Sequence, residues 1–309
     1  MNMKEEIILE RIKSIIGDEY IGDDCAYLKD LGLIVSQDNL IEGVHFSLDY
    51  MSPYQLGYKS AMVNLSDIAA SGGVCKYMTV GLSLPKDISA EFVEEFYNGL
   101  TDALDEVKII GGDITGSDKI MISITAIGTD KDRRISSRGG AKTGQVIVTS
   151  GVHGSSAGGL ELLKKGKIEP KELILAHIEP KAQSGFAQKI AENIDEDYAM
   201  MDSSDGLVDA LYKIAVSGEK SLVVDFEKVL VSEVLKTTFP AGYKDMVLYG
   251  GEDYQIIATV SKEFAQKYNL PVIGYVSDKT ENAPVKILNY DKQDKIITNL
   301  NDCFNHFSQ

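Results

Sequence analysis

The chain has 309 residues, more than one compact core usually accommodates, so we expect two domains. Its 31 Lys and Arg residues against 47 Asp and Glu residues give a formal charge of −16, which argues against general nucleic-acid binding but does not exclude a nucleotide ligand. No apolar run approaches the ~20 residues of a membrane span, and the 3 cysteines are too dispersed for a disulfide framework or a zinc site, so we expect a cytoplasmic protein that binds no membrane.

Strands and helices alternate along the first half of the chain, as the periodicity of its apolar residues indicates. The predicted elements are helices over 3–16, 53–71 and 89–104, and strands over 33–35, 76–84, 107–113 and 119–129. A charged stretch at 130–134 then interrupts the pattern. We place the domain boundary close to it, which gives an N-terminal domain over 1–137 and a C-terminal domain over 138–309.

The helix over 53–71 is the element around which the chain is organised. Its start and stop signals are Ser52 as N-cap, Pro53 in the first turn and a glycine pair at 72–73 beyond the end. Its apolar pattern is interrupted near the end by a single carboxylate, Asp67, which has no Lys or Arg beside it. A carboxylate so placed is either an exposed helix residue or a ligand for a cation.

The second half also alternates between strands and helices. We expect strands over 144–150, 198–201, 222–226, 255–260, 271–276 and 285–288, and helices that begin at about 160, 180 and 207. This pattern predicts an α/β or α+β fold. Three histidines, His153, His177 and His306, lack metal-ligand spacing and are expected in surface or loop positions.

Glycine beside an acidic residue recurs along the chain, mostly at the end of an apolar strand or at a helix start. The acidic residues in such settings are Asp23, Asp24, Asp113, Asp205, Glu252 and Asp253, and we add Asp38, Asp67 and Asp202 to them. Loops at such positions on a rigid scaffold form sites. Carboxylates that converge without cations repel one another, whereas Mg²⁺ binds carboxylate and phosphate oxygens together. The residues therefore predict a site in which several Mg²⁺ ions bind a polyphosphate.

Other motifs for phosphate binding or nucleophilic catalysis are absent or incomplete. The chain has neither the Gly-x-x-x-x-Gly-Lys-Ser/Thr of a P-loop nor the Gly-x-Gly-x-x-Gly of a Rossmann site or a kinase glycine loop. Segment 154–158 matches the Gly-x-Ser-x-Gly of a hydrolase, in which Ser156 would need an Asp and His306 as partners. We disfavour this hydrolase because the Ser does not follow its strand directly and because the acidic residues would have no role.

Two basic residues are candidates for contacts with an anionic substrate. His45 follows Asp38 by seven residues, close in sequence to the acidic set. Arg138 lies at the domain junction and is the best candidate for a phosphate contact, because other Lys and Arg residues are scarce near the acidic motifs.

Six motifs together resemble the thiamine-monophosphate kinase family, which belongs to the superfamily of aminoimidazole ribonucleotide synthetase and selenophosphate synthetase. They occur in the order of the family and span nearly the whole chain. The motifs are GDDCA at 22–26, DNLIEGVHF at 38–46, VNLSDIAA at 63–70, GGD at 111–113, DSSDGL at 202–207 and GGEDY at 250–254.

The resemblance implies a two-domain fold, with an N-terminal sheet that forms the interface of a homodimer and a C-terminal α/β domain. It implies direct transfer of the γ-phosphoryl group of ATP to thiamine monophosphate, giving thiamine diphosphate, with several Mg²⁺ ions. The implied magnesium ligands are Asp24, Ser36, Gln37, Asp38, Asp67, Asp113, Asp202 and Asp205. The implied nucleotide contacts are Gly112, Asp113, Arg138, Ser204 and Tyr97, and the implied thiamine-phosphate contacts are His45, Glu252 and Phe304.

The chain departs from the family at Gln37, where a Thr is usual, so only the main chain of Gln37 is expected to reach a metal. No catalytic His or Cys is expected, since the acceptor phosphate is already ionised at neutral pH and needs no general base. Two other functions remain open at this point. One is a sibling ATP-dependent synthetase with a different acceptor, and the other is a Mg-ATP-binding module without transfer activity.

Overall fold

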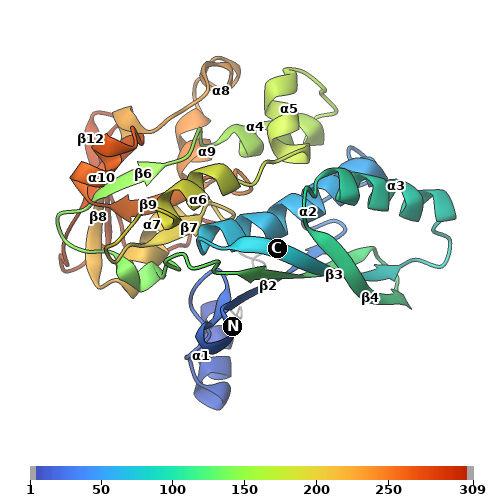
Figure 1. The fold of residues 1–309 in the computed structure, drawn as a ribbon. Helices are drawn as coiled ribbons and strands as arrows, with labels where there is room; N and C mark the ends of the chain where they lie inside the picture. Colours follow the sequence, from blue (N-terminus) through green and yellow to red (C-terminus); the bar gives the residue numbers. More distant parts are fainter. Residues whose placement is uncertain (1–4, 305–309) are drawn as a thin grey trace.

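The computed structural model describes residues 5–304, which form a mixed α/β fold with two sheets. The helices are α1 Glu5–Ile16, α2 Pro53–Ala70, α3 Ala90–Asp102, α4 Ser155–Lys164, α5 Lys171–Ile178, α6 Ser184–Ala191, α7 Leu207–Ser217, α8 Glu233–Thr238, α9 Tyr243–Tyr249 and α10 Lys262–Lys267. The strands are β1 Ala26–Leu28, β2 Leu33–Ile41, β3 Val74–Leu84, β4 Lys108–Gly116, β5 Met121–Thr129, β6 Val146–Thr149, β7 Met200–Asp202, β8 Lys220–Asp225, β9 Ile256–Val260, β10 Val272–Asp278, β11 Val285–Tyr290 and β12 Gln293–Ile297. Figure 1 shows the two sheets in two lobes that lie side by side.

The first sheet has the strand order β1-β2-β5-β3-β4, and α2 packs on the face that its alternating apolar residues form. Ile122, Ile124 and Ala126 of β5 are fully buried on this face, as the period of two in the sequence predicts. Helix α3 lies against α2 so closely that a Cβ on Gly57 would come within 1.9 Å of a backbone oxygen of Phe96. The glycines therefore permit the contact between the two helices.

Strand β4 forms the outer edge of this sheet, and only its pairing with β3 is present among the described strands. Ile110 and Ile114 on it are 55% and 67% exposed. Whereas the sequence predicted a turn after residue 113, the strand continues to Gly116, because Gly112 lets the backbone approach Val80 more closely than any Cβ would allow. The edge strand thus carries apolar side chains into solvent.

The second sheet has the order β12-β11-β8-β10-β6-β9-β7, and α7 packs on β8 and β7. The predicted strands of this half are confirmed within a few residues, and β12 is additional. A helix expected over 180–194 is confined to α6, and α4 begins at Ser155 rather than near residue 160. The apolar pattern did not predict α5, α8, α9 and α10, because helices of six to eight residues show little periodicity.

The two lobes meet along α2, whose C-terminal part contacts β7 and α6 of the second lobe. In Figure 1 this helix runs from α3 toward the second sheet. None of the helices within residues 5–304 is long and apolar enough to cross a bilayer. The three cysteines are buried and free.

Candidate active site

The C-terminal end of α2 carries Asp67 to the boundary between the lobes. The helix begins with the predicted cap: Ser52 Oγ accepts the N–H of Gln55 at 3.2 Å, and Gln55 Oε1 accepts the N–H of Ser52 at 3.1 Å. It ends at Ala70, and Gly72 with φ +86° then turns the chain into β3. The start and stop signals in the sequence therefore fix where the carboxylate lies.

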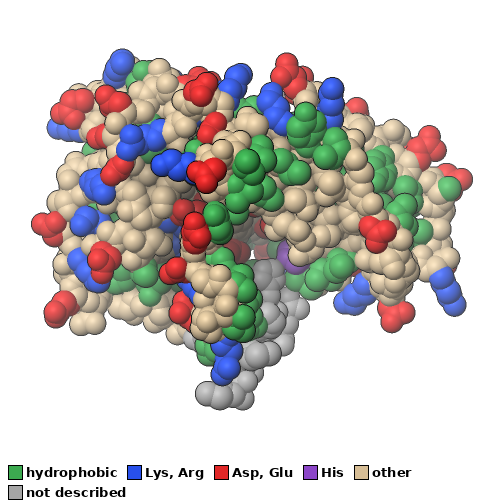
Figure 2. Space-filling view, turned by 60° about the horizontal axis from the view of Figure 1, so that its bottom comes forward, with side chains coloured by type: hydrophobic (Ala, Val, Ile, Leu, Met, Phe, Trp, Pro, Cys, Tyr) green, Lys and Arg blue, Asp and Glu red, His purple; other side chains and the backbone are tan. Residues whose placement is uncertain are grey.

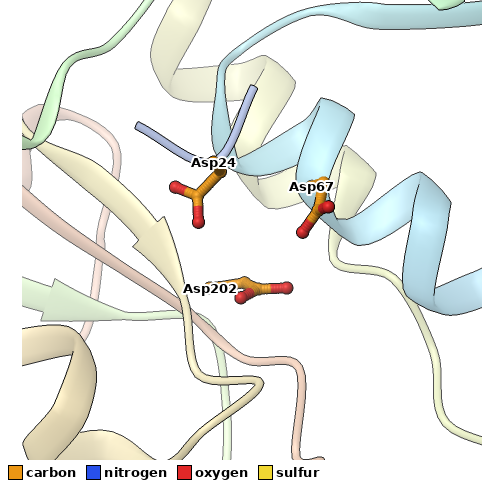
Figure 3. A group of neighbouring side chains, drawn as sticks. All are labelled: Asp24, Asp67 and Asp202. Carbon is orange, nitrogen blue, oxygen red and sulfur yellow. The ribbon is translucent and has the colours of Figure 1, made fainter. Parts of the chain in front are cut away.

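Three carboxylates from three separate segments converge at this boundary. Asp24 comes from the loop before β1, Asp67 from α2 and Asp202 from the end of β7, and one oxygen of each lies within 4.8 Å of the others. Figure 3 shows the three side chains pointing toward one another. Figure 2 looks into the hollow between the lobes, where acidic side chains lie at depth. We refer to these three residues as the acidic cluster.

Two more predicted ligands, Asp38 and Asp205, lie near the acidic cluster. Burial raises the pKa of Asp38 to about 6, with further contributions from the negative charges of Asp205 and Asp24. Burial also raises the pKa of Asp202 to about 7, with Asp24 adding to the effect. The pKa of Asp67 is raised well above its ordinary value by burial and then by Asp38, Asp202 and Asp24. The shifts have the sign expected for buried carboxylates that lie close to one another.

Serine hydroxyls hold two of the carboxylates in place. Ser36, on β2, donates a hydrogen bond to Asp67, and Ser66, on α2, donates one of 2.5 Å to Asp202 in the other lobe. The N–H of Ser204 donates to the second oxygen of Asp202 at 3.2 Å. The orientation of Asp67 and Asp202 is therefore set by hydrogen bonds within each lobe and by one, between Ser66 and Asp202, that crosses the boundary between the lobes.

Arg138 contacts the acidic cluster through an ion pair with Asp24. Its Nη2 lies 2.9 Å from Asp24 Oδ1, and its Nη1 donates to the carbonyl of Gly22 at 3.0 Å. Burial raises the pKa of Asp24 in spite of this ion pair, so the guanidinium offsets only part of the effect of burial on this carboxyl group. A groove of about 840 Å³ opens beside the pair and is lined by Asp23, Ser137 and Gly139 among others.

The chemistry of these side chains fits a hard divalent cation. The donors are carboxylate oxygens with a serine hydroxyl beside them, and they carry more negative charge than Arg138 can compensate. Mg²⁺ prefers such oxygen ligands and usually takes one or two carboxylates together with phosphate oxygens. Asp24, Asp38, Asp67 and Asp202 are the residues so placed, and Asp205 lies close enough to influence Asp38.

Gln37 does not direct its side chain toward the acidic cluster. Successive residues of a strand point to opposite faces, so Gln37 lies on the face away from Ser36 and Asp38. Its amide bonds instead to Ser123 and Thr125 at 3.2 and 3.1 Å. The expectation that only its main chain can reach a metal agrees with this orientation.

Asp113, predicted as a ligand, lies at the far edge of the first sheet. Asp38 pairs with Ile124, Ile124 with Val80, and Val80 with Gly112, so three strand spacings separate β2 from β4. At ~4.8 Å per spacing, the backbones of Asp38 and Gly112 are about 14 Å apart. The fold of a single chain therefore does not bring Gly112 and Asp113 into the acidic cluster.

Tyr97, a predicted nucleotide contact, is also distant. It lies on α3 with its ring against Phe96, and α3 packs on the N-terminal half of α2 around Gly57. The ten residues from Gly57 to Asp67 span about 15 Å of helix. Tyr97 is thus held beside the other end of α2.

The predicted thiamine-phosphate contacts lie on both lobes. His45 follows β2, and its Nδ1 accepts the N–H of Ile41 at 3.0 Å. Glu252 lies between α9 and β9, where burial alone would raise its pKa, but Lys59, His177 and His45 together hold that pKa below the ordinary value. His45 and Glu252 are therefore close enough to interact. Phe304 is 44% exposed and is the last residue that the structure describes.

His153 lies in the loop between β6 and α4, as the expectation of a surface or loop position allows, whereas His177 lies on α5 and contradicts it; neither is at the surface, because both are buried. Hydroxyl groups make this burial tolerable: Thr149 Oγ1 lies 2.8 Å from His153 Nε2, and Ser156 Oγ lies 3.1 Å from His177 Nδ1. The sequence around the two histidines contains no pattern that predicts their burial or these hydroxyl partners.

The contacts of His177 also argue against a hydrolase at Ser156. Glu252 Oε2 lies 3.3 Å from the same Nδ1 that Ser156 approaches, whereas a catalytic triad uses opposite ring nitrogens for its acid and its nucleophile. Ser156 is 1% exposed. His306, the partner considered from the sequence, lies outside the described residues.

Known proteins are similar to this chain over most of its length. Residues 22–129 match the family model described as AIR synthase related protein, N-terminal domain. A thiamine-monophosphate kinase of Aquifex aeolicus is 37% identical over 268 residues, covering 83% of this chain and 85% of the relative. One of Bacillus subtilis is 32% identical over 311 residues, covering 94% of each.

Solved structures agree with these relatives. A structure described as AaThiL complexed with AMPPCP and TMP has a TM-score of 0.88 at 32% identity, covering 98% of this chain and 97% of its own. A thiamine monophosphate kinase from Stenotrophomonas maltophilia has a TM-score of 0.74 at 28% identity, covering 91% of this chain and 95% of its own.

Proposed function

The chain belongs to the thiamine-monophosphate kinase family, and we propose that it transfers the γ-phosphoryl group of ATP to the phosphate of thiamine monophosphate. The product is thiamine diphosphate. The observation that carries this proposal is the convergence of Asp24, Asp67 and Asp202 from both lobes on one point, in a chain whose relatives bear that activity in their names.

We propose that Mg²⁺ is the cation of this site. Bound there, it would offset the repulsion between the two phosphate groups and the acidic side chains, which is about 4 kcal/mol per pair of unit charges at ~4 Å and an effective dielectric constant of ~20. The proposed ligands are Asp24, Asp38, Asp67, Asp202 and Asp205 with Ser36 and the main chain of Gln37. Burial raises the pKa values of the first four, neighbouring carboxylates add to the shifts, and a bound cation would favour the ionised forms.

The other residues bind and orient the two substrates. Arg138 and Ser204 border the acidic cluster and are the proposed nucleotide contacts, and the groove beside Arg138 has room for part of a nucleotide. His45 and Glu252 are the proposed contacts of the acceptor, together with Phe304. The acceptor phosphate is ionised at neutral pH, so the residues need only align it with the γ-phosphoryl group and exclude water.

We further propose that the chain forms a homodimer through the first sheet, with the domain boundary between residues 137 and 138. The support for a dimer is the open edge of β4 with its exposed Ile110 and Ile114. Gly112 and Asp113 lie on that edge, too far from the acidic cluster of their own chain to contact a metal or nucleotide there. Their proposed contacts therefore require the acidic cluster of a second copy of the chain.

Incubation of the protein with ATP, Mg²⁺ and thiamine monophosphate, with the products identified by mass spectrometry, tests the function. The expected products are ADP and thiamine diphosphate in equal amounts. ATP binding in titration calorimetry without any product would instead indicate a binding module. Consumption of ATP only with a different acceptor would indicate a sibling synthetase, and either result would overturn the proposal.

A further inference from the structure

Lys59 is a charged residue in the interior of the protein. Its side chain is 0% exposed on α2, in the first lobe. Within residues 5–304 it forms one ion pair, in which Nζ lies 2.9 Å from Glu252 Oε1 of the second lobe. Burial of an ammonium group is costly unless an anion compensates it, so the position of Glu252 and the charge of Lys59 depend on each other.

Glu252 is fixed from several directions. Its backbone has φ +64°, which is uncommon for a residue with a side chain, and its N–H donates to the carbonyl of Ser204 at 2.6 Å. Its second carboxylate oxygen lies 3.3 Å from His177 Nδ1. The same Nδ1 lies 3.1 Å from Ser156 Oγ, and His177 Nε2 has no hydrogen-bond partner among the described residues, so the imidazole contacts Glu252 and Ser156 through one nitrogen.

Stability alone does not account for this arrangement. A buried ion pair contributes little net stability compared with apolar residues of the same volume. Moreover, the Glu252 side chain is still 24% exposed, and it lies near His45 at the proposed acceptor site. A fixed carboxylate there suits the amino group and the positive charge of a thiamine phosphate, because it can accept hydrogen bonds and attract a cation.

We propose that Lys59 is a positioning residue of the acceptor site: its ammonium group holds the Glu252 carboxylate in the orientation that receives thiamine monophosphate. The inference rests on the function proposed above, and it goes beyond it by assigning a role to a residue that does not touch the substrate. Lys59 and Asp67 lie eight residues apart on α2, so one helix would orient both the acceptor contact and the metal site.

The test compares steady-state kinetics and ligand binding of the wild-type protein with those of Lys59→Met, Lys59→Gln, Lys59→Arg and Glu252→Gln. For Lys59→Met and Lys59→Gln we expect KM for thiamine monophosphate to rise about 10- to 100-fold, the range for loss of a hydrogen bond to a charged group, while KM for ATP changes less than about 2-fold. Lys59→Arg keeps the charge and is expected to recover part of the loss. Lys76→Met, which removes a partly exposed ion pair with Glu106, is the matched control without effect.

The double variant Lys59→Met/Glu252→Gln separates positioning from a general structural defect. If Lys59 acts through Glu252, the double variant has the same KM for thiamine monophosphate as Glu252→Gln alone. Additive effects, or equal rises in KM for both substrates, would overturn the inference. If Glu252→Gln does not fold because it leaves the Lys59 ammonium buried without an anion, Lys59→Gln, which leaves only the partly exposed Glu252 carboxylate, still decides: an unchanged KM for thiamine monophosphate would overturn the inference. Failure of the wild-type protein to bind or convert thiamine monophosphate would instead refute the proposed function.

Discussion

Ser66 of α2 donates a 2.5 Å hydrogen bond to Asp202 at the end of β7, and this bond joins the two lobes at the centre of the acidic cluster. Ser66 precedes Asp67 directly, so neighbouring residues of one helix supply both a proposed metal ligand and the group that orients another. The two lobes therefore have to be docked for the site to exist.

The first prediction concerns Asp67→Asn. We expect kcat to fall more than about 100-fold, because loss of a direct ligand should cost at least as much as loss of the groups that orient ligands. Without Mg²⁺ the variant should be more stable than the wild type by a few degrees in Tm, since the neutral amide removes one of several buried negative charges that repel each other.

Initial rates at saturating Mg²⁺ measure kcat of Asp67→Asn, and calorimetric unfolding with and without Mg²⁺ measures its Tm. The wild type should gain more stability from Mg²⁺ than the variant does, because the ion binds the folded state. A kcat equal to that of the wild type at saturating Mg²⁺ would show that Asp67 is not a ligand.

The sequence contained enough to predict the acidic cluster and the helix that carries it. Ser52 and Gly72 determine the ends of α2 through contacts with residues close in sequence, so the bounds of the helix can be predicted. Carboxylates at strand ends and helix starts come together where these ends form a site, so the acidic cluster can be predicted as well. The sequence did not reveal that Asp113 lies three strands from Asp38, because strand order is set by contacts between distant segments. It placed Asp38 just beyond its strand, whereas the residue lies within β2.

The sequence also did not predict the partners of buried polar groups. Lys59 is buried in α2, and its partner Glu252 is 193 residues further along the chain. Only the docking of the lobes brings the two together. The sequence contained one indication that Lys59 faces the second lobe: it precedes Ser66 by seven residues, so the two side chains lie on the same face of α2.

The second prediction concerns His45→Ala. The imidazole Nδ1 already accepts the N–H of Ile41, which fixes the ring beside Glu252. We expect KM for thiamine monophosphate to rise about 10-fold, corresponding to one lost polar contact, with KM for ATP unchanged. Initial rates measured with each substrate varied in turn give both constants, and an effect confined to ATP would count against the assignment.

The third prediction is a pH dependence of stability due to His153. Burial lowers the pKa of His153 from 6.5 to about 3, so the folded protein keeps it neutral while the unfolded chain is protonated below 6.5. Its contribution is fully present above pH 6.5 and is lost as the pH falls toward 3, at up to ~1.4 kcal/mol per pH unit. In contrast, the raised pKa values of Asp38 and Asp202 make the folded state gain stability as the pH falls.

His153→Gln isolates the histidine because those carboxylates are common to both proteins. We expect the variant to be less stable than the wild type at about pH 7.5, and the difference to shrink by about 1 kcal/mol at about pH 5.5. Urea unfolding of the two proteins at both pH values measures this difference. A gap of constant size would mean that His153 is protonated to the same extent in the folded and unfolded states.

The fourth prediction addresses Asp113 and the proposed dimer. If Asp113 of one copy completes the acidic cluster of another, Asp67→Asn and Asp113→Ala proteins are each inactive, but a heterodimer of the two contains one intact site. Two differently tagged variants, produced together and purified by both tags, should then have about half of the wild-type activity. If Asp113 acted within its own chain, both sites of the heterodimer would be defective and no activity would return. A failure to isolate any heterodimer would contradict the dimer itself, whereas recovery of activity would explain why a proposed ligand lies about 14 Å from Asp38 on an exposed edge strand.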